Sequence, residues 1–377
     1  KINMNKVKLI DRIILIIVIF LIYKIVEISS TIRYNLIITF ILVVLFLFSS
    51  FILIISHFFS DLGRENPTLP TKLPSVAVVT YAFNNFKAVE PTVKRLTQLK
   101  YPKPFTVYVV NDGTVGFLKK YKNVKFITLD KKHFSKNNNI KATVMNIAFK
   151  RLKEDYILCT DGDTVPEKDA LINLMGHMKG KVGAVIGYVI PKKADNLLEK
   201  IQVYEYVLSY GLWARGLSGL ESMFVVVGAL NLIDRKRFLE VGGFDVNNMT
   251  EDADLAYAFK KQGYSIRHTL KATAKTDIPN TIKGFFRQRI RWYRGACHTW
   301  LKYKSLFFNK DAGLFGVFIL PYFVFLNLLG ISIFLKFIIV SLRRFFEYLY
   351  FYIAEIISQG FIVFDLFNFN YFYVPPM

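Results

Sequence analysis

The chain has 377 residues, of which 53% are hydrophobic, and carries a formal net charge of +22 at pH 7. This length allows a globular domain of about 200 to 250 residues beside membrane segments, and the two cysteines exclude a disulfide framework and a Cys-rich zinc site. Clustered Lys and Arg are typical of nucleic-acid binding, but beside long apolar runs they are equally typical of an anionic membrane surface. We therefore expect membrane lipid and a small phosphorylated substrate as partners, and no nucleic acid.

Two apolar segments near the amino terminus predict a transmembrane hairpin. The first, 13–23, continues through Lys24 and Glu27 to a length of about 20 residues, and the second covers 34–59. Four basic residues precede the first segment, Lys1, Lys6, Lys8 and Arg12. Because cytoplasmic flanks are enriched in Lys and Arg, we expect the hairpin to return the chain to the cytoplasmic side after Asp61.

A proline-containing linker, with Pro67, Pro70 and Pro74, separates this hairpin from a segment with α/β patterning. Strands are predicted at 75–80, 105–110, 124–129 and 157–161, and helices at 89–99 and 141–152. Strand and helix alternate, which indicates parallel pairing in a Rossmann-like open sheet.

Acidic residues follow two of these strands, at the sheet edge where open α/β sheets bind ligands. Asp161 and Asp163 are candidate ligands of a hard cation, because alternation along an extended backbone points both the same way and Gly162 permits a tight turn. Asp112 is a candidate for contacting a base or ribose. A solvated acidic turn and a turn-forming Asp-Gly are the respective alternatives.

Further along, a strand is predicted at 182–190, a helix at 196–212 and an apolar run at 225–233. Thr250 then fits the N-cap of a helix whose first turn contains Glu251 and Asp252. These acids either complement the helix dipole or supply a general base near a bound substrate.

The densest basic and aromatic cluster covers 285–295. On a helix, Gln288, Arg291 and Trp292 share one face, where a guanidinium suits a diphosphate and an indole offers a stacking surface for a sugar. The alternative is a basic interfacial helix lying on lipid.

Four motifs follow one another in this order: Asn111-Asp112-Gly113, Thr160-Asp161-Gly162-Asp163, Thr250-Glu251-Asp252 and Gln288-Arg289-Ile290-Arg291-Trp292. Together they resemble the D, DxD, TED, QxxRW signature of the membrane-embedded family 2 glycosyltransferases, which include hyaluronan, chitin, cellulose and poly-N-acetylglucosamine synthases. The similarity covers about residues 74 to 300. Two weaker matches are Lys141 with Asn146, similar to a KxxxxN segment, and 202–206, similar to a QxxEY helix.

The resemblance implies a GT-A fold, Mg²⁺ or Mn²⁺ as cofactor, and a UDP-sugar donor. It also implies a role for each matching position. On the donor side these are Asp112 at the uridine, Asp161 and Asp163 at the metal and the diphosphate, and Lys141, Gln288 and Arg291 as further donor contacts. On the acceptor side they are Asp252 as the base, with Glu251 and Trp292 binding the acceptor.

The carboxyl-terminal segment predicts one span at 313–335 and a second apolar stretch, spanning or interfacial, at 345–364. Arg343 and Arg344 fall on the outer side in this topology, against the positive-inside tendency. Four spans are few for a polymer channel, so a second copy or another partner could complete it. The resulting division is a transmembrane hairpin at 1–65, a GT-A domain at 66–282, interfacial helices at 283–311 and a transmembrane or interfacial region at 312–377.

The sequence and the resemblance together predict a processive, inverting polysaccharide synthase of the plasma membrane that uses UDP-N-acetylglucosamine and translocates its product. Cellulose is less favoured, because 226–230 departs from the segment expected in cellulose synthases. One alternative is an enzyme like ceramide glucosyltransferase, which moves a single sugar to a lipid. Another is a membrane scaffold or nucleic-acid binder without catalysis, which would account for the charge but not for four ordered motifs.

Overall fold

The computed structural model describes residues 68–82, 86–111, 121–129 and 139–359. The expected amino-terminal hairpin and Asp112 lie outside these ranges. The described residues up to Tyr322 form one compact unit, and those from Phe323 onward belong to a second one.

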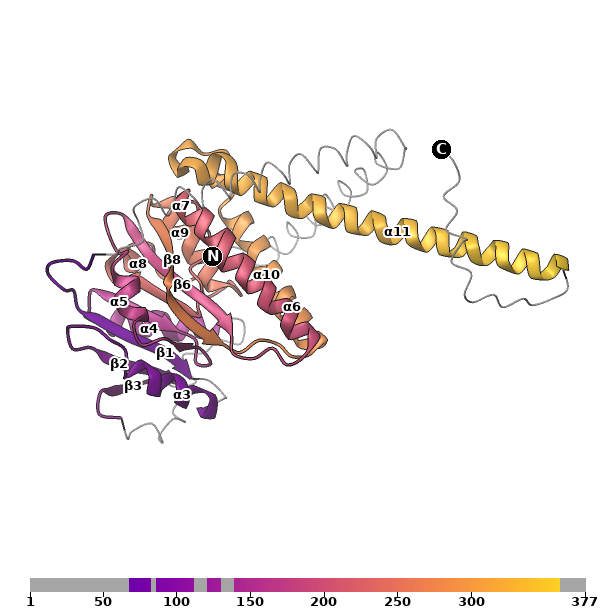
Figure 1. Cartoon of the computed structure of the whole chain (residues 1–377). Coiled ribbons are helices and arrows are strands. Elements are labelled where there is room, and N and C mark those ends of the chain that lie inside the picture. Colours follow the sequence, from indigo (N-terminus) through magenta and orange to yellow (C-terminus); the bar gives the residue numbers. More distant parts are fainter. Residues whose placement is uncertain (1–67, 83–85, 112–120, 130–138, 360–377) are drawn as a thin grey trace. The chain divides into compact units, whose positions relative to one another are not determined.

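The larger unit is built on a mixed eight-stranded sheet with the strand order β3-β2-β1-β4-β7-β6-β8-β5 (Figure 1). Its strands are β1 (Val76–Ala82), β2 (Thr106–Asn111), β3 (Val124–Thr128), β4 (Tyr156–Thr160), β5 (Val165–Pro166), β6 (Val182–Pro191), β7 (Leu230–Asp234) and β8 (Ser265–Thr276). The four strands predicted at the start of the domain are present within one or two residues of the expected bounds.

The pairing confirms the parallel sheet as far as β4 and departs from it afterwards. Val78 of β1 lies opposite Val107 of β2 on one side and Leu158 of β4 on the other, both in parallel register. On the far side of β4, Cys159 faces Asn231 of the antiparallel strand β7. Strand β7 also runs antiparallel to β6, which pairs in parallel with β8. The carboxyl end of β4 therefore lies where the parallel half of the sheet meets the mixed half.

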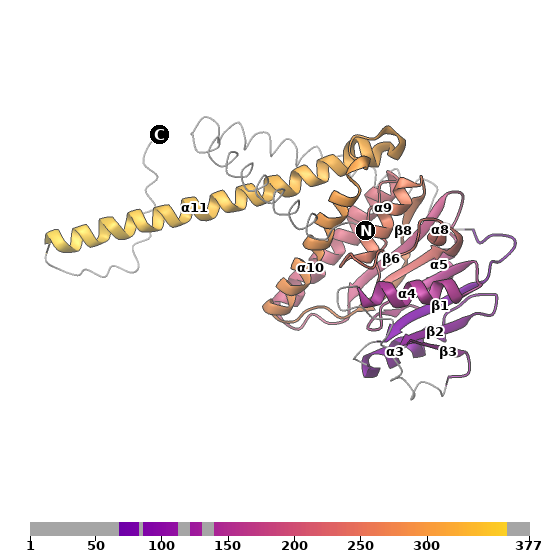
Figure 2. The same cartoon turned by 180° about the vertical axis from the view of Figure 1, so that it is seen from behind.

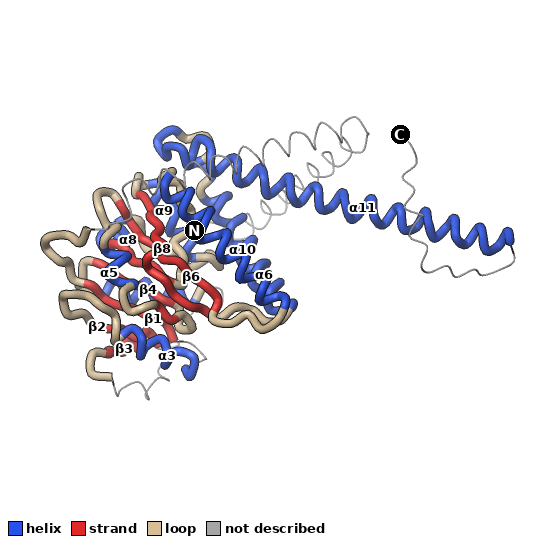
Figure 3. The backbone as a smooth tube through the Cα atoms, in the orientation of Figure 1, coloured by secondary structure: helices blue, strands red, loops and turns tan. Residues whose placement is uncertain are grey.

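Helices lie around this sheet. Figure 2 shows them from behind, and Figure 3 colours helices and strands differently. The helices are α3 (Phe86–Leu96), α4 (Ile140–Arg151), α5 (Ala170–Met175), α6 (Leu197–Tyr206), α7 (Arg215–Gly219), α8 (Arg235–Glu240), α9 (Glu251–Lys261) and α10 (Ile282–Lys302). A π-helix, Val207–Ala214, joins α6 to α7. The basic and aromatic cluster thus lies within a single 21-residue helix, α10, that extends beyond the cluster at both ends.

Apolar side chains cover both faces of the sheet's central strands. Val78 and Leu158 belong to a core that also contains Leu96 of α3 and Leu174 of α5, all fully buried. Alternate residues of the same strands, such as Ile157, lie outside this core and are fully buried as well. A strand buried on both faces reads as a continuous apolar run, which explains why β1 and β4 were recognisable in the sequence.

Helix α11 (Leu320–Gln359), most of which belongs to the second unit, is one continuous helix of 40 residues. The two predicted segments at 313–335 and 345–364 are therefore not separated by a break in the described part; Arg343 instead pairs with Glu347 one turn later, at 2.7 Å. Among the described residues, this is the one helix long and apolar enough to cross a membrane. At about 1.5 Å per residue, its length is roughly twice the thickness of a bilayer's hydrocarbon core.

Candidate functional site

The paired acids Asp161 and Asp163 lie in a turn, closed by the Thr164 N–H donating to the Asp161 carbonyl oxygen at 3.0 Å. Our expectation that an extended backbone aligns them is therefore wrong. The tight turn expected at Gly162 is present, although the φ of this glycine is not in the left-handed region. A Cβ at this glycine would lie 2.5 Å from the Tyr81 carbonyl oxygen, so the turn needs glycine because it packs directly against the end of β1.

Lys141 connects this turn to the helix that carries the predicted base. Its Nζ lies 2.6 Å from Oδ1 of Asp161 and 3.2 Å from Oε1 of Glu251. Burial lowers the pKa of Lys141, but the two carboxylates outweigh it and hold this pKa well above its usual value. Lys141 is thus a fixed positive charge between the first acid of the DxD turn and the start of α9.

Asp252 lies in the first turn of α9 with its carboxylate held by two backbone groups. Oδ1 accepts a hydrogen bond from the Ala253 N–H at 2.8 Å, and Oδ2 accepts one from the Gly228 N–H at 3.4 Å. Burial, reinforced by the neighbouring charge of Glu251, nevertheless raises the pKa of Asp252 to about 6. A carboxyl group with such a pKa is ionised at neutral pH and is a stronger base than an exposed aspartate.

Thr250 occupies the N-cap position of α9, as predicted, but its side chain makes no capping hydrogen bond. The hydroxyl donates instead to Oδ1 of Asn248 at 3.2 Å. The predicted N-cap position is therefore confirmed, without the hydrogen bond that a capping side chain usually accepts.

The second acid of the turn, Asp163, lies in a polar and negatively charged environment. Its Oδ1 accepts hydrogen bonds from the hydroxyls of Thr164 and Thr276 at 3.3 and 3.4 Å. Burial raises the pKa of Asp163, and the charges of Asp161 and Asp277 raise it further. Asp277, which follows β8, did not stand out in the sequence because no motif marks it.

The chemistry of this turn fits a divalent cation bound together with a ligand. Two neighbouring carboxylates gain from a nearby positive charge, and Mg²⁺ is usually held by one or two carboxylates plus substrate phosphates. Within the described ranges, no group of three or more His, Cys, Asp or Glu side chains could hold a metal by itself. Asp161 and Asp163 could thus contribute part of a metal's coordination shell and would need a ligand to complete it.

Helix α10 presents the QxxRW residues, with two arginines in different settings. Arg289 pairs with Glu205 of α6 and stacks on the Trp292 ring, 4.3 Å from its centroid. Arg291 is exposed, and its Nη1 donates to the Met249 carbonyl oxygen just before α9, at 3.3 Å. Oε1 of Gln288 is buried and has no hydrogen-bond partner among the described residues.

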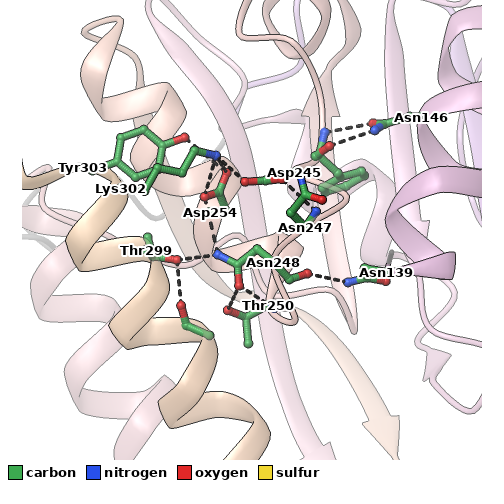
Figure 4. Close-up of polar contacts among 12 residues, drawn as sticks. Asn139, Asn146, Asp245, Asn247, Asn248, Thr250, Asp254, Thr299, Lys302 and Tyr303 are labelled. Atoms are coloured by element: carbon green, nitrogen blue, oxygen red, sulfur yellow. Dashed lines mark hydrogen bonds and ion pairs between the residues drawn. The ribbon is translucent and has the colours of Figure 1, made fainter. Parts of the chain in front are cut away.

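Two asparagines without a predicted role support the site (Figure 4). Asn139 caps α4 and donates to Oε2 of Glu251 at 2.7 Å and to the Asn248 carbonyl oxygen at 2.9 Å. Asn146 exchanges two hydrogen bonds with the backbone of Phe244, at 2.8 and 2.9 Å. An asparagine immediately before a helix is a recognisable N-cap signal, but its second contact, more than a hundred residues away, leaves no local trace.

Known proteins are similar to this chain both in sequence and in fold. The sequence profile described as "Glycosyl transferase family group 2" matches residues 156–363. The chain is 27% identical over 274 residues to the poly-beta-1,6-N-acetyl-D-glucosamine synthase of Staphylococcus aureus (strain COL), covering 71% of this chain and 65% of that protein. It is 26% identical over 234 residues to the synthase of the same name from Staphylococcus epidermidis, covering 60% and 55%. The matches thus span less than two thirds of these relatives.

The similarity in fold is to a solved structure. The structure is similar to that of the mannosyltransferase PcManGT from Pyrobaculum calidifontis, solved in complex with GDP-Man and Mn²⁺. The TM-score is 0.51 with 17% sequence identity, over 70% of this chain and 74% of that one. At this identity the likeness bears on the fold alone.

Proposed function

The chain belongs to the glycosyl transferase family group 2 and has a GT-A fold, and from this premise we propose that it is a processive, inverting synthase that polymerises N-acetylglucosamine from a UDP-sugar. The observation that carries this proposal is the position of Asp252. A half-buried carboxylate with a raised pKa lies beside Glu251, which Lys141 joins to the first acid of the DxD turn. A base and a candidate donor site thus occupy one region.

In the proposed reaction, Asp252 accepts the proton of an acceptor hydroxyl as the hydroxyl oxygen bonds to the anomeric carbon of the donor sugar. The bond from that carbon to the diphosphate oxygen breaks on the opposite side, so UDP departs and the configuration inverts. The two backbone hydrogen bonds from Ala253 and Gly228 orient the carboxylate for this transfer.

The donor side consists of positively charged groups near the paired acids. Asp161 and Asp163 would hold Mg²⁺ or Mn²⁺, which when bound supplies charge stabilisation to the departing diphosphate. In the proposal Lys141 and Arg291 add positive charge and Gln288 adds an amide to the same subsite. Asp112, which lies outside the described residues, is assigned to the uridine.

The proposal places the acceptor at α9 and α10, and the membrane at α6 and α10. In the proposal Trp292 stacks on the acceptor sugar and Glu251 contributes a further contact. Large apolar side chains are exposed on both helices: Leu197, Ile201, Tyr204 and Leu208 on α6 and its π-helical continuation, and Ile282, Phe286, Ile290 and Tyr293 on α10. These surfaces suit a lipid interface, which supports a catalytic domain held at the cytoplasmic face of the plasma membrane.

The proposed division keeps the transmembrane hairpin at 1–65, the GT-A domain at 66–282, interfacial helices at 283–311 and a membrane region at 312–377. Translocation of the polymer through this membrane region, completed by a second copy of the chain, is part of the proposal. Its support is the apolar composition of α11 together with the relatives' description as polymer synthases.

The deciding experiment incubates the purified protein in detergent with individual UDP-sugars and Mn²⁺ and measures UDP release. We expect release with UDP-N-acetylglucosamine and radiolabel in a ladder of chain lengths. A single organic-extractable glycolipid would favour the lipid glucosyltransferase alternative, and release only with GDP-mannose would overturn the uridine assignment. No release with any nucleotide sugar would leave the scaffold alternative.

A further inference from the structure

Helices α9 and α10 are joined by a partly buried ionic cluster (Figure 4). The Nζ of Lys302, at the end of α10, lies 2.7 Å from Oδ1 of Asp254 and 2.7 Å from Oδ2 of Asp245. Asp254, in the first turn of α9, has a side chain only 2% exposed and also accepts a hydrogen bond from the Tyr303 hydroxyl at 3.2 Å. Lys302 therefore neutralises two carboxylates that come from different sides of the Thr250 motif.

One turn earlier on α10, Thr299 takes part in a second set of contacts, which reaches Asn248 just before that motif. The side-chain amide of Asn248 donates to the Thr299 hydroxyl at 2.8 Å. Its Oδ1 accepts from both the N–H and the hydroxyl of Thr250, at 3.0 and 3.2 Å. Asn248 and Thr299 are each about 1% exposed, so this small network is shielded from water.

A third contact fixes the separation of the two helices. A Cβ at Gly295 would lie 2.0 Å from the Thr250 hydroxyl oxygen and 2.7 Å from its Cβ. Both atoms belong to Thr250, whose side chain is short and not flexible enough to move aside. Gly295 is therefore the residue that lets the α10 backbone approach Thr250 this closely.

We propose that Asn248, Asp254, Gly295, Thr299 and Lys302 form a positioning seam that sets the placement of the base Asp252 relative to the donor contact Arg291. This inference rests on the function proposed above for those two residues. The seam holds Thr250 and Asp254, the residues two before and two after Asp252, to α10. Arg291 lies one helical turn before Gly295 and itself donates to Met249, next to Thr250. A shift between α9 and α10 therefore changes the distance between base and donor.

A seam of this kind acts on turnover more than on donor affinity, because the paired acids after β4 and Lys141 on α4, which the proposal places at the diphosphate, are not part of it. We expect Lys302→Met to lower turnover about 10- to 100-fold, the loss typical of a displacement near 1 Å between reacting groups. Lys302→Arg, which keeps the positive charge, should retain most of the activity. Thr299→Val removes the hydroxyl that accepts from Asn248 and donates to the Gly295 carbonyl oxygen within α10. It should lower turnover about fivefold, the loss expected for the one hydrogen bond that links α10 to Asn248.

The measurement is the release of UDP from UDP-N-acetylglucosamine with Mn²⁺, expressed per UDP-binding site counted by calorimetry in detergent. Counting sites removes molecules that have not folded, so a purely stabilising contact would leave this ratio unchanged. Arg237→Met is the matched control, because Arg237 of α8 pairs with Asp234 and donates to the carbonyl oxygens of Gly180 and Val182, none of which belongs to α9 or α10. We expect it to lower the melting temperature while turnover per site stays at the wild-type value.

Wild-type turnover per site in both Lys302→Met and Thr299→Val would overturn the seam, and so would an equal loss in Arg237→Met. If Lys302→Met does not fold, Thr299→Val decides alone. Failure of the proposed function is distinguishable, since the wild-type protein itself would then release no UDP.

Discussion

The two sides of the candidate site are built in different ways. The donor-side acids follow β4, whose central residues Ile157 and Leu158 are fully buried and whose backbone pairs with strands on both sides. The acceptor-side residues lie on α9 and α10, together with the donor contacts Gln288 and Arg291, and these two helices are joined by side-chain hydrogen bonds and ion pairs. A hydrogen-bonded sheet leaves little freedom to its strand ends, whereas two helices joined by side chains can shift when one side chain changes. Mutations of the acids after β4 should therefore act locally, and mutations of the contacts between α9 and α10 through geometry.

The largest effect is expected on the donor side. Asp161→Asn or Asp163→Asn should abolish transfer, because either change removes a negative charge from the proposed metal and diphosphate site while the β4 backbone stays in place. Removing divalent metal with EDTA should do the same to the wild-type protein, and Mn²⁺ should restore it. Full activity in excess EDTA would refute the metal assignment.

On the acceptor side, Asp252→Asn should reduce turnover by roughly 10²–10⁴, the range typical of a lost general base. Donor binding should change little, because the ion pairs of Lys141 with Asp161 and Glu251 remain in this variant. Calorimetry with UDP and a turnover assay on the same preparation separate the two quantities. A collapse of UDP binding would instead make Asp252 a nucleotide ligand or a structural cap.

The contrast between the acids after β4 and the side-chain contacts of α9 and α10 also explains what the sequence could predict. The apolar strands, the acids after β4 and the order of the four motifs are local signals, and the structure has the parallel strands β1 to β4 where they were expected. The antiparallel return of β7 carries no such signal, because an apolar run is the same in either direction. The contacts of Asn139, Asn248 and Lys302 join residues 48 to 112 positions apart, so no local pattern could reveal them.

A third prediction compares two neighbours on α10. Arg291→Ala should weaken donor binding and slow transfer about 10- to 100-fold, as expected for a lost charge-assisted hydrogen bond to a departing diphosphate. Trp292→Ala should leave UDP binding nearly intact and suppress chain elongation. If α10 were only a basic helix on lipid, both variants would lose membrane association and keep wild-type polymer synthesis in detergent.

The acid limb of the pH profile should report Asp252. Because a base must be ionised, and burial raises the pKa of this carboxyl group from 3.8 to about 6, kcat/KM should rise with pH through about 6 and level off above it. One pH unit below that value, activity should be lower by roughly tenfold. A limb near pH 4 would mean that Asp252 is not the titrating base.

The smallest effect tests how tightly the two sides meet at Gly228. A Cβ there would lie 2.9 Å from Nζ of Lys141 and 3.6 Å from both carboxylate oxygens of Asp161, while the glycine's φ is not in the left-handed region. Gly228→Ala should therefore fold normally and displace the lysine ammonium from Asp161, which weakens one hydrogen bond. Such a loss corresponds to about 1 kcal/mol, or roughly a fivefold rise in the KM for the donor.

Gly211→Ala is the matched control for this substitution, because its Cβ would meet no atom within 4 Å. Comparing the KM of both variants with that of the wild type isolates the contact with Lys141 from the general effect of adding a methyl group. An unchanged KM in Gly228→Ala would mean that the Lys141–Asp161 pair does not contribute to donor binding. A loss of turnover at constant KM would place the effect on Asp252 instead, whose Oδ2 accepts the Gly228 N–H.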